Sequence, residues 1–182
     1  MTVDPLAWFR AWHDAAGVDV PEAMALATAS ADGAPSVRMV LLKEADERGF
    51  VFFTNYESRK GRELAENPRA ALLFHWPGRQ VRVEGAVERL PAGESDAYWA
   101  TRPAGSRASA AASRQSAVLT SREELEQAAA AQPPDPARPP HWGGFLLRPE
   151  RWEFWEHRDD RLHDRTRVRR DGEGWVSELL YP

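Results

Sequence analysis

Near its C-terminal end the chain carries a cationic segment, Arg161-Leu162-His163-Asp164-Arg165. In an extended strand, side chains at alternate positions share one face, which would place Arg161, His163 and Arg165 together. Two guanidinium groups and an imidazole in a row repel one another unless water or an anion lies beside them. Aromatic residues at 152–155 lie just upstream, so the pattern suits a planar, phosphorylated ligand. The alternative is a solvated strand face, because acidic residues are interspersed.

A second pair of cations, Arg38 and Lys43, brackets the apolar run Met39-Val40-Leu41-Leu42. Their odd spacing sends them to opposite faces of a flat strand. They could therefore meet one ligand only through a strand end or a bulge, or bind different parts of it. The alternative is that both are solubilising residues at the ends of a strand.

A third group of cations follows Ser58, which can cap a helix. Arg59, Lys60 and Arg62 then fall in the first turn, where the helix macrodipole disfavours positive charge. A helix N-terminus is itself an anion site, so the segment either holds an anion or forms a solvated turn.

Hydroxyl and guanidinium groups recur at Tyr98, Arg102 and Ser106, a spacing that would align them on one helix face. Pro103 interrupts that helix, so the alignment is incomplete. Together they could cradle a phosphate, or Tyr98 could be a core residue with surface neighbours. The pair Gln115-Ser116 adds neutral donors and acceptors.

The composition is that of a globular protein. The chain has 182 residues, 42% of them hydrophobic and 29% charged, which predicts one domain over residues 1–182. It has no cysteine, so disulfides and thiolate chemistry are excluded. The net charge of −4 and the lack of a recognition motif argue against nucleic-acid binding. No apolar run is long enough to span a bilayer and no secretion signal is evident, which predicts a cytoplasmic protein.

Periodicity and turn residues predict a mainly β protein with helices, an α+β fold built on an antiparallel barrel. The expected helices cover residues 5–16, 58–66, 93–101 and 105–116, with another after a capping box at Ser121 and Glu124. Residues 104–116 could instead form a flexible linker. Strands are expected at 23–30, 36–42, 50–54, 70–76, 80–88, around Phe145, 152–155, 161–168 and 175–180.

These motifs occur in an order that, taken together, resembles the pyridoxamine 5′-phosphate oxidase family over nearly the whole chain. The segments that carry the resemblance are 38–43, 53–55, 58–60, 80–81, Tyr98 with 102–103 and Ser106, 114–116, 142–145, 154–155 and 161–165. The resemblance implies an FMN-binding split β-barrel that forms a homodimer with FMN at the subunit interface. It implies oxidation of pyridoxine or pyridoxamine 5′-phosphate to pyridoxal 5′-phosphate by O2, with release of H2O2.

The resemblance also implies roles for individual residues. FMN would be bound by Arg38, Met39, Val40, Leu41, Leu42, Lys43, Phe53, Thr54, Arg59, Lys60, Gln80, Gln115, Ser116, Trp155 and Arg165. The substrate would be bound by Lys43, Tyr98, Arg102, Ser106, Arg161, Leu162 and His163, with Arg161 and His163 over the reacting ring. No metal is expected.

Two departures from the family bear on the substrate. Only Met1 to Val3 precede the first helix cap, where family members often carry a longer arm, and the chain ends Glu178-Leu179-Leu180-Tyr181-Pro182 instead of in an Arg-Leu-Ala-Pro sequence. Two alternatives therefore stay open: a related flavin oxidase of another planar substrate, such as a phenazine precursor, and a non-catalytic protein that binds FMN or pyridoxal phosphate.

Overall fold

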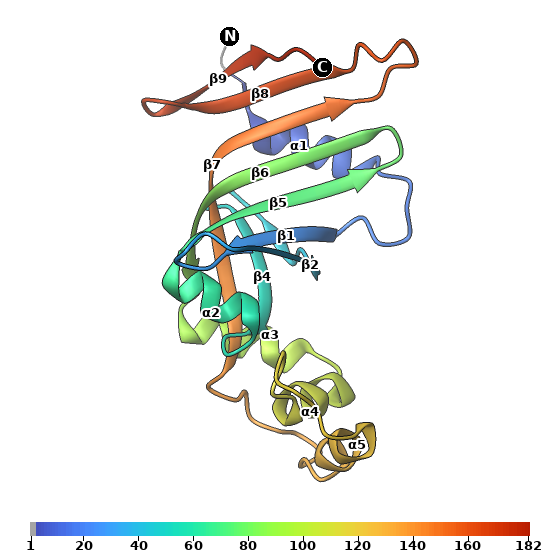
Figure 1. Ribbon diagram of the computed structural model, residues 1–182, viewed down its shortest axis with the longest axis vertical. Helices are drawn as coiled ribbons and strands as arrows, with labels where there is room; N and C mark the ends of the chain where they lie inside the picture. Colours follow the sequence, from blue (N-terminus) through green and yellow to red (C-terminus); the bar gives the residue numbers. More distant parts are fainter. Residues whose placement is uncertain (1–2) are drawn as a thin grey trace.

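The structure is a computed structural model that describes residues 3–182, and its framework is a nine-stranded antiparallel sheet curled into a split barrel (Figure 1). The strands are β1 (Ala23–Ala29), β2 (Pro35–Leu41), β3 (Glu44–Ala45), β4 (Phe50–Asn55), β5 (Arg69–Trp76), β6 (Arg79–Arg89), β7 (Trp142–Glu156), β8 (Asp164–Asp171) and β9 (Gly174–Leu179). The order across the sheet is β2-β1-β5-β6-β7-β4-β3, and β8 pairs with β7 and β9.

Helices cover the faces and one end of this sheet. They are α1 (Pro5–Asp14), α2 (Arg59–Glu66), α3 (Ala92–Thr101), α4 (Ala104–Ala112) and α5 (Arg122–Ala130). Helix α1 lies across one face of the sheet, whereas α4 and α5 project from the opposite end of the molecule to β8 and β9 (Figure 1). No helix within residues 3–182 is long and apolar enough to cross a membrane.

The barrel closes where the chain passes directly from β2 to β3. The backbone N–H of Lys43 donates to the carbonyl of Val51 on β4 at 2.8 Å, and Leu42 N–H donates to Glu22 at 2.9 Å. The two ends of the strand order, β2 and β3, are thereby joined through residues 42–43. Lys43 thus lies at the seam, beyond the end of β2, and the flat-strand spacing to Arg38 does not apply to it.

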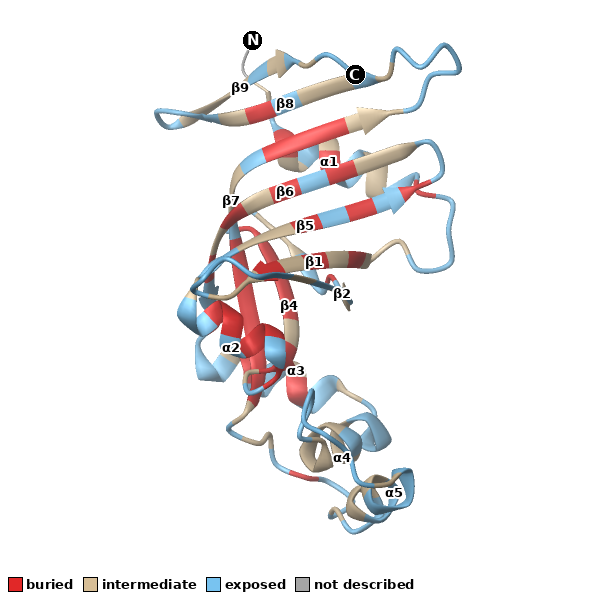
Figure 2. Cartoon of the chain, viewed as in Figure 1, coloured by how far each residue is buried: buried red, intermediate tan, exposed pale blue. Residues whose placement is uncertain are grey.

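An aromatic core fills the barrel beneath α1. Phe9 on α1 is buried and makes edge contacts with Phe50 and Phe74, while Trp8 stacks on Phe154 at 4.0 Å between ring centroids. The helix starts at Asp4, whose carboxylate accepts from the N–H groups of the first turn. Buried residues concentrate in β4, β6 and β7, and α4 and α5 bury none of theirs (Figure 2). The stable part of the fold is therefore the barrel, and α4 and α5 form an outer wall.

Most expected elements are confirmed within one or two residues, including the capping box, in which the Ser121 hydroxyl accepts from Glu124 N–H at 3.1 Å. The strands expected around Phe145 and at 152–155 are one continuous strand, β7. The helix expected at 105–116 is α4 and ends at Ala112. The expectation of an α+β antiparallel split barrel is confirmed, whereas a single domain over 1–182 stays a prediction.

The strand expected at 161–168 was wrong at its start, since β8 begins at Asp164. Arg161 has a φ of 66°, in the left-handed region that no regular strand contains. Arg161, His163 and Arg165 therefore do not share one strand face. The alternation argument failed because residues 157–163 form the turn between β7 and β8.

Gly85 offers a test of the way β7 bends. The pairing of β6 with β7 shifts register between Glu84 and Gly85, and a Cβ on Gly85 would lie 1.9 Å from the carbonyl oxygen of Arg148. We expect Gly85→Ala to destabilise the protein by about 1–3 kcal/mol, because a backbone atom must move. Gly93→Ala is the control: nothing lies within 4 Å of its Cβ on α3, and it should stabilise by up to about 1 kcal/mol. Urea unfolding measures both, and equal stability of the two variants would contradict the close packing of β6 on β7.

Candidate active site

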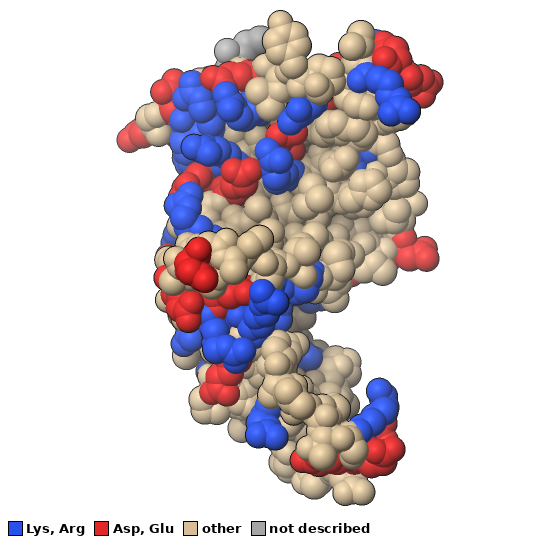
Figure 3. Space-filling view, in the orientation of Figure 1, with Lys and Arg blue, Asp and Glu red and all other residues tan. Residues whose placement is uncertain are grey.

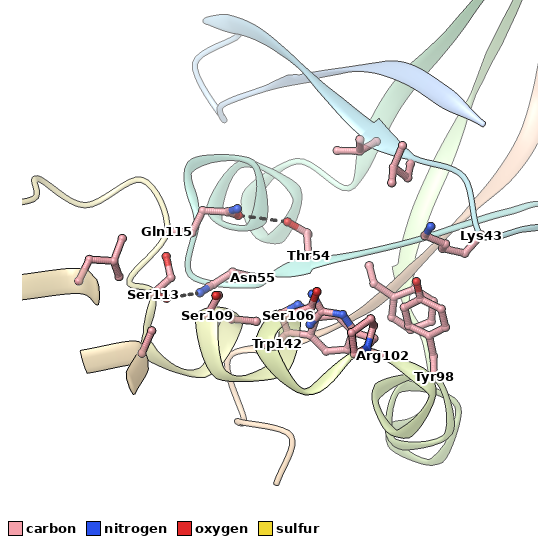
Figure 4. Close-up of a pocket in the computed structure, with 18 of the residues that line it drawn as sticks. Lys43, Thr54, Asn55, Tyr98, Arg102, Ser106, Ser109, Ser113, Gln115 and Trp142 are labelled. Atoms are coloured by element: carbon pink, nitrogen blue, oxygen red, sulfur yellow. Dashed lines mark hydrogen bonds between the residues drawn. The ribbon is translucent and has the colours of Figure 1, made fainter. Parts of the chain in front are cut away.

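A cavity of about 900 Å³ opens between the end of β2, strand β4, the start of α2 and the helices α3, α4 and α5 (Figure 4). The expected site residues that line it are Met39, Val40, Leu41, Lys43, Phe53, Thr54, Lys60, Tyr98, Arg102, Ser106 and Gln115. These residues come from five separate stretches of sequence, and the closed barrel brings them to one place.

Lys60 forms one end of this cavity. Its side chain is buried at the first turn of α2, and its Nζ donates to Gln115 Oε1 at 2.9 Å and to Thr54 Oγ1 at 3.2 Å. Burial lowers the pKa of Lys60, and the charge of Arg38 lowers it further while Glu63 raises it, to about 8. A buried ammonium with only neutral hydrogen-bond acceptors, at a helix N-terminus, is an anion-binding arrangement.

Arg38 and Arg59 stand behind this end of the cavity and do not line it. Both pair with the buried carboxylate of Glu63, Arg38 Nη2 at 3.3 Å and Arg59 Nε at 2.8 Å. Leu42 likewise lies in the hydrophobic core. Arg38 is half-buried on the inner face of β2, so the alternative of a solubilising strand-end residue does not describe it.

Tyr98, Arg102 and Ser106 form the other end of the cavity, although no continuous helix carries them. Helix α3 ends at Thr101, Arg102 is extended, and α4 begins at Ala104, which is the break that Pro103 predicts. All three side chains still line the same cavity (Figure 4). The three side chains therefore meet at one cavity, as the helical spacing suggested, although the helix is broken between them.

The Arg102 guanidinium is held by aromatic rings and not by a carboxylate. It lies 4.7 Å from the centroid of Trp142 and 5.3 Å from that of Trp99, and its buried Nη1 has no hydrogen-bond partner. Burial lowers its pKa, against a smaller opposing effect of Tyr98. A buried guanidinium nitrogen without a partner requires an acceptor, and an anionic ligand in the cavity would supply one.

A stack of aromatic rings forms the wall between the two ends. Phe53 and Tyr98 stack at 4.0 Å, and Phe53 and Trp142 at 5.5 Å between centroids. Trp142 thus contacts both the stack and Arg102. Its role was missed from the sequence, as were those of Asn55, Ser109 and Ser113, which also line the cavity. Two features of the sequence could have indicated these residues. Asn55 is polar at the end of β4, and Ser109 and Ser113 lie about one turn apart at the end of α4.

A second hollow of about 250 Å³ brings together three further expected residues, Gln80, Trp155 and Arg165. They are register partners across β6, β7 and β8. Arg165 donates to Glu153 Oε1 at 2.8 Å from Nη2. Trp155 and Trp142 lie near opposite ends of β7, on the order of 40 Å apart along the strand at its usual rise per residue. The two sets are therefore separate within one chain.

The remaining expected residues lie outside both hollows. Leu162 is exposed and Arg161 lies in the turn before β8, while the His163 ring contacts Trp155 at 4.7 Å and its Nδ1 accepts from Arg158 N–H at 3.1 Å. Ser116 is exposed beside Gln115, with a φ of 73°. Arg161 and Ser116 are the two non-glycine residues with positive φ in the described part of the chain, and such strain concentrates at functional sites.

The antiparallel split barrel is the fold of the FMN-binding split-barrel proteins. A family model described as pyridoxamine 5′-phosphate oxidase matches residues 15–156. A second, described as the pyridoxine 5′-phosphate oxidase C-terminal dimerisation region, matches residues 142–182. The chain belongs to the pyridoxamine 5′-phosphate oxidase family, which confirms an oxidoreductase and supports FMN as its cofactor.

Individual relatives agree with this assignment. A pyridoxine/pyridoxamine 5′-phosphate oxidase of Thermosynechococcus vestitus is 54% identical over 98% of this chain and 89% of that protein. A pyridoxine/pyridoxamine 5′-phosphate oxidase of Rubrobacter xylanophilus is 54% identical over 98% of this chain and 87% of that protein. Among solved structures, PhzG from Burkholderia lata in complex with tetrahydrophenazine-1-carboxylic acid has a TM-score of 0.91 and 38% identity. The match covers 98% of this chain and 93% of that one. An FMN-binding protein of Nostoc punctiforme shares the fold, with a TM-score of 0.81 and 22% identity over the full length of both chains.

If Lys60 holds the phosphate of FMN, its pKa should make FMN binding dependent on pH. The ammonium is present below about pH 8 and is lost as the pH rises through that value, so a phosphate bound there would lose one cationic partner. We expect the dissociation constant of FMN to rise above pH 8 by up to about tenfold per pH unit. Quenching of FMN fluorescence by the apoprotein measures it. Lys60→Ala should bind FMN more weakly and lack this pH dependence, and an unchanged pH profile in that variant would contradict the assignment to Lys60.

Proposed function

We propose that this protein is an FMN-dependent oxidase that converts pyridoxine or pyridoxamine 5′-phosphate to pyridoxal 5′-phosphate, with O2 as oxidant and H2O2 as product. The observation that carries the proposal is the pair of phosphate-type donor sets in one cavity. Lys60 with Gln115 and Thr54 forms one set, and Tyr98, Arg102 and Ser106 form the other. One cavity with two anion sites fits two phosphorylated ring compounds bound together.

The residues of the cavity fit FMN at the Lys60 end. A buried ammonium and a helix N-terminus would hold the phosphate, and the exposed apolar side chains of Met39 and Leu41 flank the space for the ring. When bound, FMN supplies the hydride-accepting chemistry and its reoxidation by O2. The chain itself supplies binding, orientation and charge.

At the other end Arg102 would grip the substrate phosphate, with the hydroxyl groups of Tyr98 and Ser106 beside it. Lys43, at the barrel seam, lines the same cavity and would add a further cation there. Fixing both rings in one cavity brings the reacting atoms within reach, which is the proximity contribution to catalysis.

A homodimer would complete this site. Gln80, Trp155, Arg165 and the segment 161–163 cannot reach the cavity of their own chain, because β7 separates them from it. A second copy could present them to the first. The outer face of β2 exposes Val37, Met39 and Leu41, an apolar row suited to an interface. The C-terminal match to a dimerisation region supports this arrangement.

The dimer can be tested on the holoprotein by light scattering. We expect a homodimer, and we expect Val37→Glu to shift it toward monomer, because a carboxylate would be buried in the apolar row without a partner. Val20→Glu, a similarly exposed position outside β2, is the control and should stay dimeric. A wild-type monomer that binds FMN tightly would contradict the shared site.

A related oxidase of a phenazine precursor is the second candidate, since PhzG is similar over almost its full length. The phosphate-type donors Lys43, Tyr98, Arg102 and Ser106 favour a phosphorylated substrate. The two functions are separated by measuring H2O2 release with each phosphorylated vitamer and with dihydro- or tetrahydrophenazine carboxylates. A non-catalytic binding protein would release none with either.

Arg102→Ala distinguishes the substrate site from the flavin site. A charge-assisted hydrogen bond is worth roughly 1.5–3 kcal/mol, so kcat/KM for pyridoxamine phosphate should fall about ten- to a hundredfold. FMN content should be unchanged. If the segment 161–163 reaches the substrate from the partner, Arg161→Ala should behave in the same way. Arg170→Ala, on β8 over Trp175, is the matched control and should keep full activity. Full activity of a folded Arg102→Ala holoprotein toward phosphorylated vitamers would favour the second candidate.

A further inference from the structure

Glu63 is a buried carboxylate at the junction of three elements. Its side chain is 7% exposed, and it accepts hydrogen bonds from Thr28 on β1 and Ser36 on β2, both at 2.5 Å. It also pairs with Arg38 on β2 and with Arg59 one turn earlier on α2. Burial alone would raise its pKa, but the hydrogen bonds and the charge of Arg38 hold it at about 2. The group is therefore an anion at every physiological pH.

The partners of this carboxylate are cations that the family resemblance assigns to FMN. Arg38 pairs with Oε2 of Glu63 and Arg59 with Oε1, and the Arg38 guanidinium also donates to Thr28 Oγ1 and Leu26 O. A charged fork with several fixed partners has one geometry, whereas a solvated arginine samples many. In Figure 3, blue and red atoms lie side by side on the surface in the region where Figure 1 shows α2.

Charge balance gives Glu63 a second effect. Arg38, Arg59 and Lys60 lie around the start of α2, and Glu63 is the carboxylate among them. With the exposed pair Glu57 and Arg62 at the same helix start, four cations and two anions leave two positive charges, which matches a phosphate of about −2. Without Glu63, three cations would face one another across a half-buried site.

We propose that Glu63 is a positioning residue of the flavin phosphate site, which holds Arg38 and Arg59 behind the Lys60 end of the cavity and supplies the counter-charge that lets three cations assemble before FMN binds. This inference rests on the proposed function, because it assumes that the Lys60 end of the cavity receives FMN. Glu63 itself lies outside the cavity and acts through its partners.

The same charge acts on Lys60. The charged groups that face Lys60 are Arg38 from β2 and Glu63 on its own helix, while β4 and the segment after α4 contribute the neutral Thr54 and Gln115. Arg38 favours the neutral amine and Glu63 favours the ammonium. Loss of the carboxylate charge should therefore move the pH at which Lys60 loses its proton to a lower value.

The test compares FMN with riboflavin, which lacks the phosphate, on apoprotein of Glu63→Gln. We expect the dissociation constant of FMN to rise at least about tenfold and that of riboflavin to stay within about twofold, because only the phosphate contacts are disturbed. As the pH rises, the loss of FMN affinity should also begin at a lower pH in Glu63→Gln than in the wild-type protein. Glu66→Gln, an exposed acid one turn later on α2, is the matched control and should resemble wild type.

Each other outcome overturns the inference. Equal weakening of FMN and riboflavin would show a structural role only, and unchanged or tighter FMN binding would show that the arginines orient without Glu63. If Glu63→Gln does not fold, Glu63→Asp keeps the charge and should weaken FMN severalfold with riboflavin unchanged; parallel changes would again overturn it. Failure of wild-type protein to bind FMN would instead reject the proposed function on which the inference rests.

Discussion

Strand β7 is the constraint on which the rest of the structure depends. Its fifteen residues pair with β4 and β6 along the first half and with β6 and β8 along the second. A strand that belongs to both halves must bend, and it does so at Pro149 opposite Gly85, where the register shifts. One end of β7 brings Trp142 to the cavity and the other brings Trp155 to the second hollow. The same strand thus creates the site and divides its residues between two places.

Burial of positive charge is the second organising feature. Lys60 is buried and Arg102 is half-buried, with its Nη1 shielded from water, and neither has a carboxylate among its hydrogen-bond partners. Such groups cost free energy in the empty protein, and an anionic ligand recovers it. The structure stabilises each cation differently: hydroxyl and amide oxygens surround Lys60, and indole rings flank Arg102.

Glu63 shows why a cationic site also needs an anion. A buried carboxylate with four partners ties β1, β2 and α2 together, so the Lys60 end of the cavity is anchored to the barrel. Glu63 lies four residues after the first residue of α2, and that spacing alone does not indicate its partners. In the sequence, Glu63 reads as one more acid on a charged helix. Glu63 reaches its partners on β1 and β2 only because α2 packs against this part of the sheet.

The sequence by itself determined the elements and the chemistry of the residues. Alternation, caps and turn residues placed nearly every strand and helix, because these are local properties of backbone and side chain. The resemblance identified the family. Tertiary structure decided which residues meet. It turned Lys43 into a seam residue, brought Tyr98, Arg102 and Ser106 together across a break, and removed Arg161 and His163 from a strand face. Those outcomes depend on long-range closure of the barrel and on a left-handed residue in a turn, neither of which local periodicity encodes.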